Sequence, residues 1–88
     1  MSAHIIILGF VQGVGMRRFI AKKANQLGLS GWVKNLPDSR VEVLVQGDKE
    51  KIVELIKIIE QGNIFSDVKD VVVEWAEDKE TLNDFLIL

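Results

Sequence analysis

The chain has 88 residues, of which 48% are hydrophobic and 27% are charged, and its formal net charge is −2. This composition excludes a disordered chain, and the length allows one core, so we expect a single domain over residues 1–88. The absence of cysteine excludes disulfides and thiolate metal sites. The first apolar run, residues 5–8, is too short for a signal peptide or a membrane span, so we expect a cytoplasmic protein that does not bind membranes.

The charges are distributed unevenly along the chain. Residues 1–37 hold five basic side chains and no acidic one, whereas residues 38–88 hold 13 acidic and 6 basic ones. A small anionic ligand fits the basic first part better than a nucleic acid, which usually requires a broader basic surface. The alternative is that two solvated faces differ in sign without any ligand.

The first third of the chain predicts a strand followed by a helix. Residues 4–10 form the strand, and the unbroken apolar run within it indicates a central strand that is buried on both faces. Apolar residues then recur at three- and four-residue spacing, which predicts an amphipathic helix over 16–27. Gly28 follows as the residue that ends this helix.

A hairpin and a second helix are predicted in the middle of the chain. Residues 31–36 and 40–46 read as two strands around a turn at 37–39. A helix over 49–61 follows, because its apolar residues share one helical face and Asp48 is a suitable N-cap.

The last third predicts a loop at 63–66, a long strand at 67–76 and a short strand at 85–88. The resulting order, β-α-β-β-α-β with a terminal strand, indicates an α+β, ferredoxin-like sandwich. Its two helices lie on one face of a four- to five-stranded antiparallel sheet. This fold hosts many functions and decides none of them.

The segment from Gly9 to Arg17 carries the strongest functional signal. Glycines at 9, 13 and 15 lead from the first strand into the first helix. Glycine permits positive φ, so successive main-chain N–H groups can converge on an anion, and the start of a helix adds further unpaired donors. Arg17 then offers a planar guanidinium that can bind two phosphate oxygens.

Two segments, Gly9 to Arg17 and Leu27 to Pro37, resemble the signature segments of the acylphosphatase family. The resemblance extends over nearly the whole chain. It implies a hydrolase that cleaves the carboxyl–phosphate anhydride of a small acyl phosphate without a metal or other cofactor. It also implies that Arg17 binds the phosphoryl oxygens and that Asn35 positions the attacking water. The implied phosphate cradle consists of Gln12, Gly13, Val14, Gly15 and Met16.

Other interpretations of these residues remain. Asn35 is also suited to cap the turn before Pro37, Gln12 to close its loop through its side chain, and Arg18 to be a surface charge. The main functional alternative is a non-catalytic module that binds phosphate or carbamoyl phosphate. An RNA-binding domain shares the element order, but it needs aromatic side chains on the central strands and a basic sheet face.

Three features depart from the family's pattern. Met16 stands where an aromatic residue is usual, and Ser39 stands where glycine is common and costs roughly 1 kcal/mol if positive φ is required there. Residues 63–66 differ most and place Ile64 and Phe65 in a turn, either against the core or exposed for a partner. We expect a monomer whose cradle holds the phosphoryl end while the acyl group projects into solvent, and hence broad selectivity.

Overall fold

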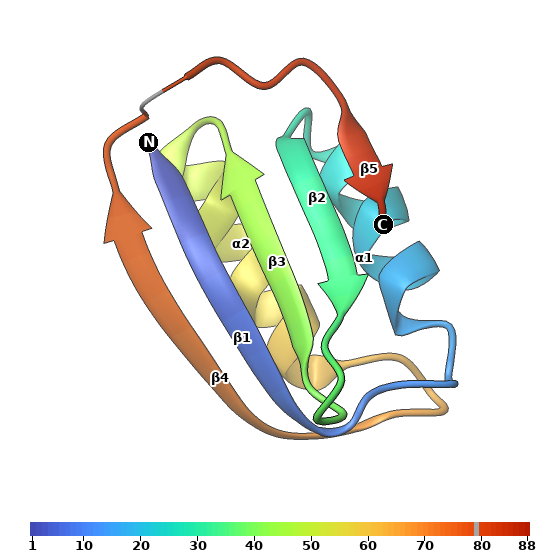
Figure 1. Ribbon diagram of the computed structural model, residues 1–88. Helices are drawn as coiled ribbons and strands as arrows, with labels where there is room; N and C mark the ends of the chain where they lie inside the picture. Colours follow the sequence, from blue (N-terminus) through green and yellow to red (C-terminus); the bar gives the residue numbers. More distant parts are fainter. Residues whose placement is uncertain (79) are drawn as a thin grey trace.

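The computed structural model describes residues 1–78 and 80–88, which form a sheet with two helices packed on it (Figure 1). None of the helices in these two ranges has the length and apolar character needed to cross a membrane. The elements are β1 Ser2–Phe10, α1 Met16–Gln26, β2 Ser30–Asn35, β3 Val41–Gln46, α2 Lys49–Gln61, β4 Asp67–Ala76 and β5 Phe85–Ile87.

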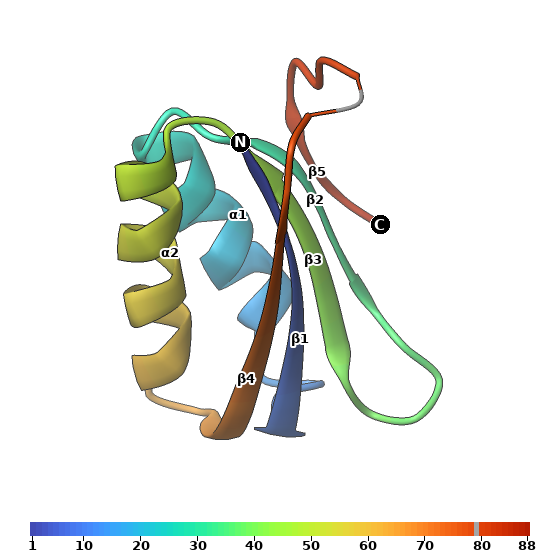
Figure 2. The same cartoon turned by 90° about the vertical axis from the view of Figure 1, so that its left-hand side faces the viewer.

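The strands lie in the order β4-β1-β3-β2-β5, and both helices cover the same face of the sheet (Figure 2). The ferredoxin-like arrangement is therefore confirmed. The expectation of a wholly antiparallel sheet is wrong at one edge, because β5 pairs with β2 in parallel, with Gly31 opposite Phe85. Strand β4 finishes at the same end of the sheet at which β2 starts. The chain crosses that end to reach the far side of β2, so β5 starts beside the start of β2 and runs in the same direction.

Strand β1 is central, as predicted, but only one of its faces is buried. Ile5 and Ile7 are fully buried beneath the helices, whereas Ile6 and Leu8 on the opposite face are half-buried. The prediction of burial on both faces is wrong because no second layer covers that face in the part of the chain that the structure describes. The strand also begins two residues earlier than predicted, since Ser2 pairs with both neighbouring strands.

The core lies between the sheet and the two helices. Every second residue of β1, β2 and β3 faces the helices, and the helix residues that face the sheet recur every three or four positions. The buried residues therefore follow the period of two for strands and of 3.6 for helices. Helix α1 ends at Gln26, one residue before the predicted end, and Gly28 follows the C-cap Leu27 with a φ of 72°. The Asp48 side chain accepts a hydrogen bond from Glu50 N at the start of α2, so the predicted N-cap is confirmed. The fully buried residues of the helices are Ile20, Ala24, Ile52, Leu55 and Ile59.

The open face of the sheet carries a polar cluster formed by His4, Lys34 and Glu42. Glu42 lies between the other two, 2.6 Å from His4 Nε2 and 3.5 Å from Lys34 Nζ. The hydrogen bond with His4 lowers the pKa of Glu42 below its ordinary value; partial burial opposes this effect and Lys34 adds to it. The native state therefore favours the ionised form of Glu42 more strongly than the unfolded chain does.

This cluster makes the stability depend on pH in a defined direction. A lowered native pKa stabilises the fold fully above the unfolded pKa of about 4.3, and the contribution is lost as the pH falls through the native value. We expect Glu42→Gln to lower the free energy of unfolding by about 0.5–1 kcal/mol at pH 7. Urea denaturation at pH 7 and pH 3 checks this, with Glu60→Gln as control. An equal loss at both pH values contradicts the assignment.

Ser39 in the β2–β3 turn has a φ of 76°, in the left-handed region that favours glycine. We therefore expect Ser39→Gly to raise the free energy of unfolding by roughly 0.5–1 kcal/mol, because the strain outweighs the added freedom of the unfolded chain. Chemical denaturation measures the change. An unchanged or lower stability shows that the turn holds serine without strain.

Candidate active site

The loop between β1 and α1 forms a cradle of unpaired main-chain donors. Gly13 and Gly15 adopt φ values of 74° and 75°, and Gly15 precedes α1 without a side-chain cap. Among the described residues, the N–H groups of residues 13–18 find no hydrogen-bond acceptor. The first N–H groups of a helix have no partner within it, and here the loop before α1 adds further unpaired donors at the positive end of the helix dipole. The loop is therefore suited to hold an anion.

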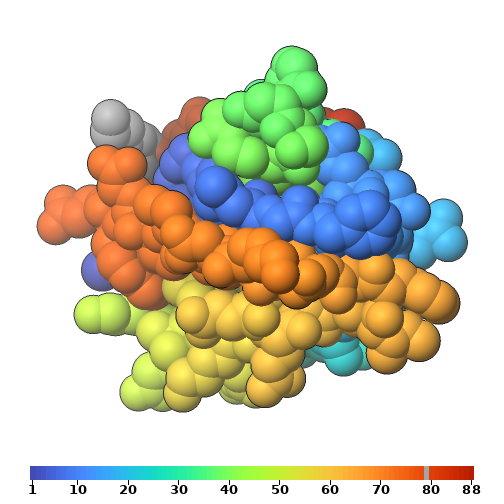
Figure 3. Space-filling model, turned by 90° about the horizontal axis from the view of Figure 1, so that it is seen from below, coloured from blue at the N-terminus to red at the C-terminus, as the bar shows by residue number. Residues whose placement is uncertain are grey.

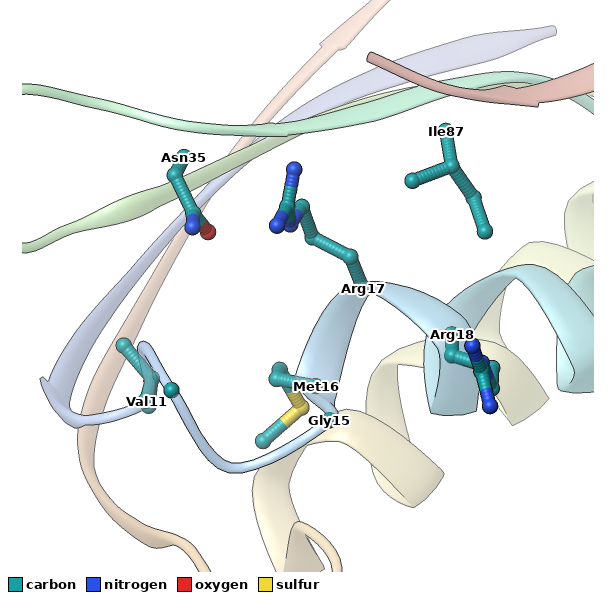
Figure 4. A pocket seen from close by; sticks show the side chains of 8 residues that line it. Val11, Gly15, Met16, Arg17, Arg18, Asn35 and Ile87 are labelled. Atoms are coloured by element: carbon teal, nitrogen blue, oxygen red, sulfur yellow. The ribbon is translucent and has the colours of Figure 1, made fainter.

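This cradle borders a pocket of about 300 Å³. Figure 4 shows Arg17 inside it, with Asn35 on one side and Arg18 and Ile87 on the other. Five of the predicted site residues line the pocket: Gly13, Gly15, Met16, Arg17 and Asn35. The structure therefore brings the predicted arginine and asparagine together at the loop with the unpaired donors.

Arg17 extends from the first turn of α1 and is anchored by one of its donors. Its Nη1 donates to the main-chain oxygen of Leu88 at 2.9 Å. Within residues 1–78 and 80–88, no acidic side chain forms an ion pair with Arg17. The guanidinium is thus held in place through one of its donors, and its other N–H groups have no hydrogen-bond partner among the described residues.

Asn35 is the last residue of β2 and lies on the face of the sheet that the helices cover. Side chains alternate along a strand, so Asn35 shares this face with the buried Val33. Its side chain forms no hydrogen bond with the described residues, the turn before Pro37 included. The amide therefore offers both a donor and an acceptor to the pocket.

Gln12 and Val14 belong to the cradle loop without lining the pocket. The Gln12 side chain donates to Leu36 O at 2.8 Å and to Arg40 O at 2.9 Å, so it closes the loop through its side chain onto the β2–β3 turn. Val14 points toward a groove on the other side of the loop. Met16 is buried in the core, so its main chain faces the pocket while its side chain anchors the start of α1.

Asn63 supports the cradle, and sequence reasoning did not identify this role. Its Nδ2 donates to Val14 O at 2.8 Å, although the two residues are 49 positions apart. Because a trans peptide is planar, the C=O of Val14 and the N–H of Gly15 point in opposite directions. A hydrogen bond that fixes the first also fixes the second. Nothing in the spacing signals this contact, because it depends on how the α2–β4 loop folds back.

The loops that form the site gather at one end of the molecule. Figure 3 views this end and shows the blue chain that follows β1 between the green β2–β3 turn and the orange start of β4. His4 lies on the open face of the sheet, bonded to Glu42, and does not line the pocket. Arg18, expected as a surface charge, is exposed but also lines the pocket.

Comparison with known proteins agrees with this geometry. The family model for acylphosphatase matches residues 3–87. The chain belongs to the acylphosphatase family. An acylphosphatase of Chlorobaculum tepidum is 45% identical over 85 residues, which are 97% of this chain and 92% of that relative.

Solved structures give the same result for the fold. The crystal structure of acylphosphatase from Bacillus subtilis superposes with a TM-score of 0.96 at 37% identity, covering 99% of this chain and 97% of that one. Full-length HypF in its phosphate- and nucleotide-bound form also matches, with a TM-score of 0.87 and 31% identity, over 99% of this chain but only 11% of HypF. Acylphosphatases thus match over their whole length, whereas in HypF the match is one small part.

Removing the Asn63 amide is expected to weaken the cradle without unfolding the chain. Loss of one orienting hydrogen bond lowers kcat/KM for an acyl phosphate by roughly tenfold in Asn63→Ala. Steady-state kinetics measures this, and circular dichroism confirms that the variant is folded. Asn83→Ala serves as the control outside the pocket. Equal kinetics for the parent and Asn63→Ala contradict the supporting role.

Proposed function

We propose that this acylphosphatase binds the phosphoryl group of an acyl phosphate with Arg17 and the cradle N–H groups, and that Asn35 positions the attacking water. The observation that carries the proposal is the pocket in which Arg17, Asn35 and the unpaired donors of residues 13–18 meet. Arg17 and the cradle present positive potential, and Asn35 is the neutral polar group opposite them.

The reaction requires little covalent chemistry from the protein. The water oxygen forms a bond to phosphorus, and the bond from phosphorus to the acyl oxygen breaks, so its electron pair leaves with the carboxylate. A carboxylate is a weak base, and it departs without being protonated. The products are the carboxylate and inorganic phosphate, and the proton lost by the water passes to a phosphate oxygen.

Stabilisation of charge is therefore the main task of the site. In phosphoryl transfer the charge spreads over the three equatorial oxygens while the attacking and leaving oxygens stay in line. Preoriented N–H groups and a fixed guanidinium stabilise this charge without having to reorganise. The hydrogen bond from Arg17 to Leu88 O contributes by fixing the guanidinium before the substrate arrives.

Asn35 supplies the positioning of the nucleophile. Its amide oxygen accepts a hydrogen bond from the water and orients a lone pair toward phosphorus, which lowers the entropy cost of attack. The chain's one histidine, His4, is engaged with Glu42 on the open face of the sheet. We therefore assign the role of proton acceptor to the substrate's own phosphate.

Kinetics of the purified chain tests these roles. With benzoyl phosphate in the presence of EDTA, we expect turnover by the parent and a loss of at least roughly 10²-fold in kcat for Arg17→Ala and for Asn35→Ala. Arg17→Lys keeps the charge but loses the planar fork, so we expect its kcat to lie between those of the parent and Arg17→Ala. Lys57→Ala and Asn25→Ala, at exposed helix positions outside the pocket, are the controls.

The outcomes separate the candidate functions. Inhibition by EDTA contradicts a mechanism without a metal, and wild-type rates in either alanine variant remove that residue's role. A folded parent that binds inorganic phosphate without turnover supports the alternative of a phosphate- or carbamoyl-phosphate-binding module. The HypF match is the observation that keeps this alternative in view, since that structure is phosphate-bound. Isothermal titration measures the phosphate binding, and the turnover assay distinguishes the two cases, because an enzyme also binds phosphate as its product.

A further inference from the structure

An apolar groove of about 480 Å³ lies beside the phosphate pocket, between α1 and the loop of residues 62–66. Val14 and Phe19 form its floor on the α1 side, and Ile64 and Phe65 form its wall on the loop side. The sequence left open whether these two loop residues fold onto the core or stay exposed. They stay exposed, with 90% of Ile64 and 69% of Phe65 accessible to solvent.

The loop displays these side chains in a fixed conformation. Phe65 N donates to Asn63 Oδ1 at 3.1 Å, and Asn63 N donates to Ser66 Oγ at 3.0 Å. The bond from Asn63 to Val14 O then ties the loop to the cradle. Large apolar side chains that are exposed together, on a loop held by such hydrogen bonds, are typical of a surface that binds an apolar group.

The groove adjoins the phosphate pocket at two residues. Gly15 and Arg18 line both. In an in-line displacement the leaving group lies opposite the attacking water. Figure 4 shows Asn35, the residue assigned to the water, on one side of Arg17 and Arg18 on the other. The acyl group of a bound substrate is thus directed toward the side where the groove begins.

We propose that this groove binds the acyl part of the substrate, and that the chain prefers acyl phosphates with an aromatic or branched aliphatic acyl group. This inference rests on the proposed function and replaces the expectation that the acyl group projects into solvent. Ile64 and Phe65 contact the acyl group, and Arg18 lies at the junction of the two spaces. Selectivity then arises from a loop that contributes nothing to phosphate binding except through Asn63.

The test compares KM values for benzoyl phosphate and acetyl phosphate in the parent and in Phe65→Ser and Ile64→Ser. The ratio of the two KM values is taken within each protein and then compared between proteins, which cancels the different intrinsic reactivity of the two substrates. We expect the serine variants to raise KM for benzoyl phosphate about fivefold, the effect of about 40 Å² of buried apolar surface, with less than about a twofold change for acetyl phosphate. Val72→Thr, an exposed apolar position on the open sheet face, is the matched control.

Four results overturn the proposal. An unchanged substrate ratio in both serine variants, with both substrates hydrolysed, removes the acyl role and leaves the proposed function intact. A parent that hydrolyses neither substrate contradicts both the acyl role and the proposed function. Faster turnover of succinyl phosphate than of benzoyl phosphate, lost in Lys22→Ala, shows that the groove selects a carboxylate instead. Sedimentation velocity tests a different occupant of the groove. If the parent self-associates and Phe65→Ser abolishes this, the groove binds a second copy of the chain.

Discussion

The site depends on a loop that must be held rigid without using its own N–H groups. Residues 13–18 leave these donors unpaired, so the usual means of fixing a loop, hydrogen bonds from its main-chain N–H groups, is not available there. The structure holds the loop by other atoms. The Gln12 side chain reaches the β2–β3 turn, and the Val14 carbonyl accepts from Asn63 on the α2–β4 loop. The cradle is thereby hydrogen-bonded to two neighbouring loops, and its own N–H donors stay available for a ligand.

The same arrangement explains why distant segments meet at one pocket. Gln12 ties the cradle to the turn that follows β2, and this sets the distance between the cradle and Asn35. The parallel pairing of β5 with β2 brings Leu88 beside α1, where its oxygen anchors Arg17. Each polar group of the pocket is thus positioned by an element that is itself fixed by core packing, such as Val33 in β2 or Met16 in α1.

The helices and strands could be predicted from the sequence because they depend on local patterns, whereas the roles of Arg17 and Asn35, which line one pocket, stay predictions. The apolar periods gave the helices and strands, the glycines gave the cradle, and a resemblance over most of the chain singled out Arg17 and Asn35. Three features depended instead on how elements pack. An apolar run of four residues does not show how many layers cover a strand, so β1 was misjudged. The direction of β5 follows from where β4 ends. The contact of Asn63 with Val14 joins two loops without any periodic signal.

The anchoring of Arg17 on Leu88 has a consequence for the dynamics of the enzyme. Strand β5 is the shortest in the described part of the chain and lies at an edge, and Leu86 to Leu88 are at least half exposed. Short edge strands open locally at a free energy far below that of global unfolding. Each such opening frees the guanidinium from its anchor while the core stays folded. We therefore expect the fraction of molecules with Arg17 anchored to depend on local opening at the sheet edge, which amide hydrogen exchange in β5 measures.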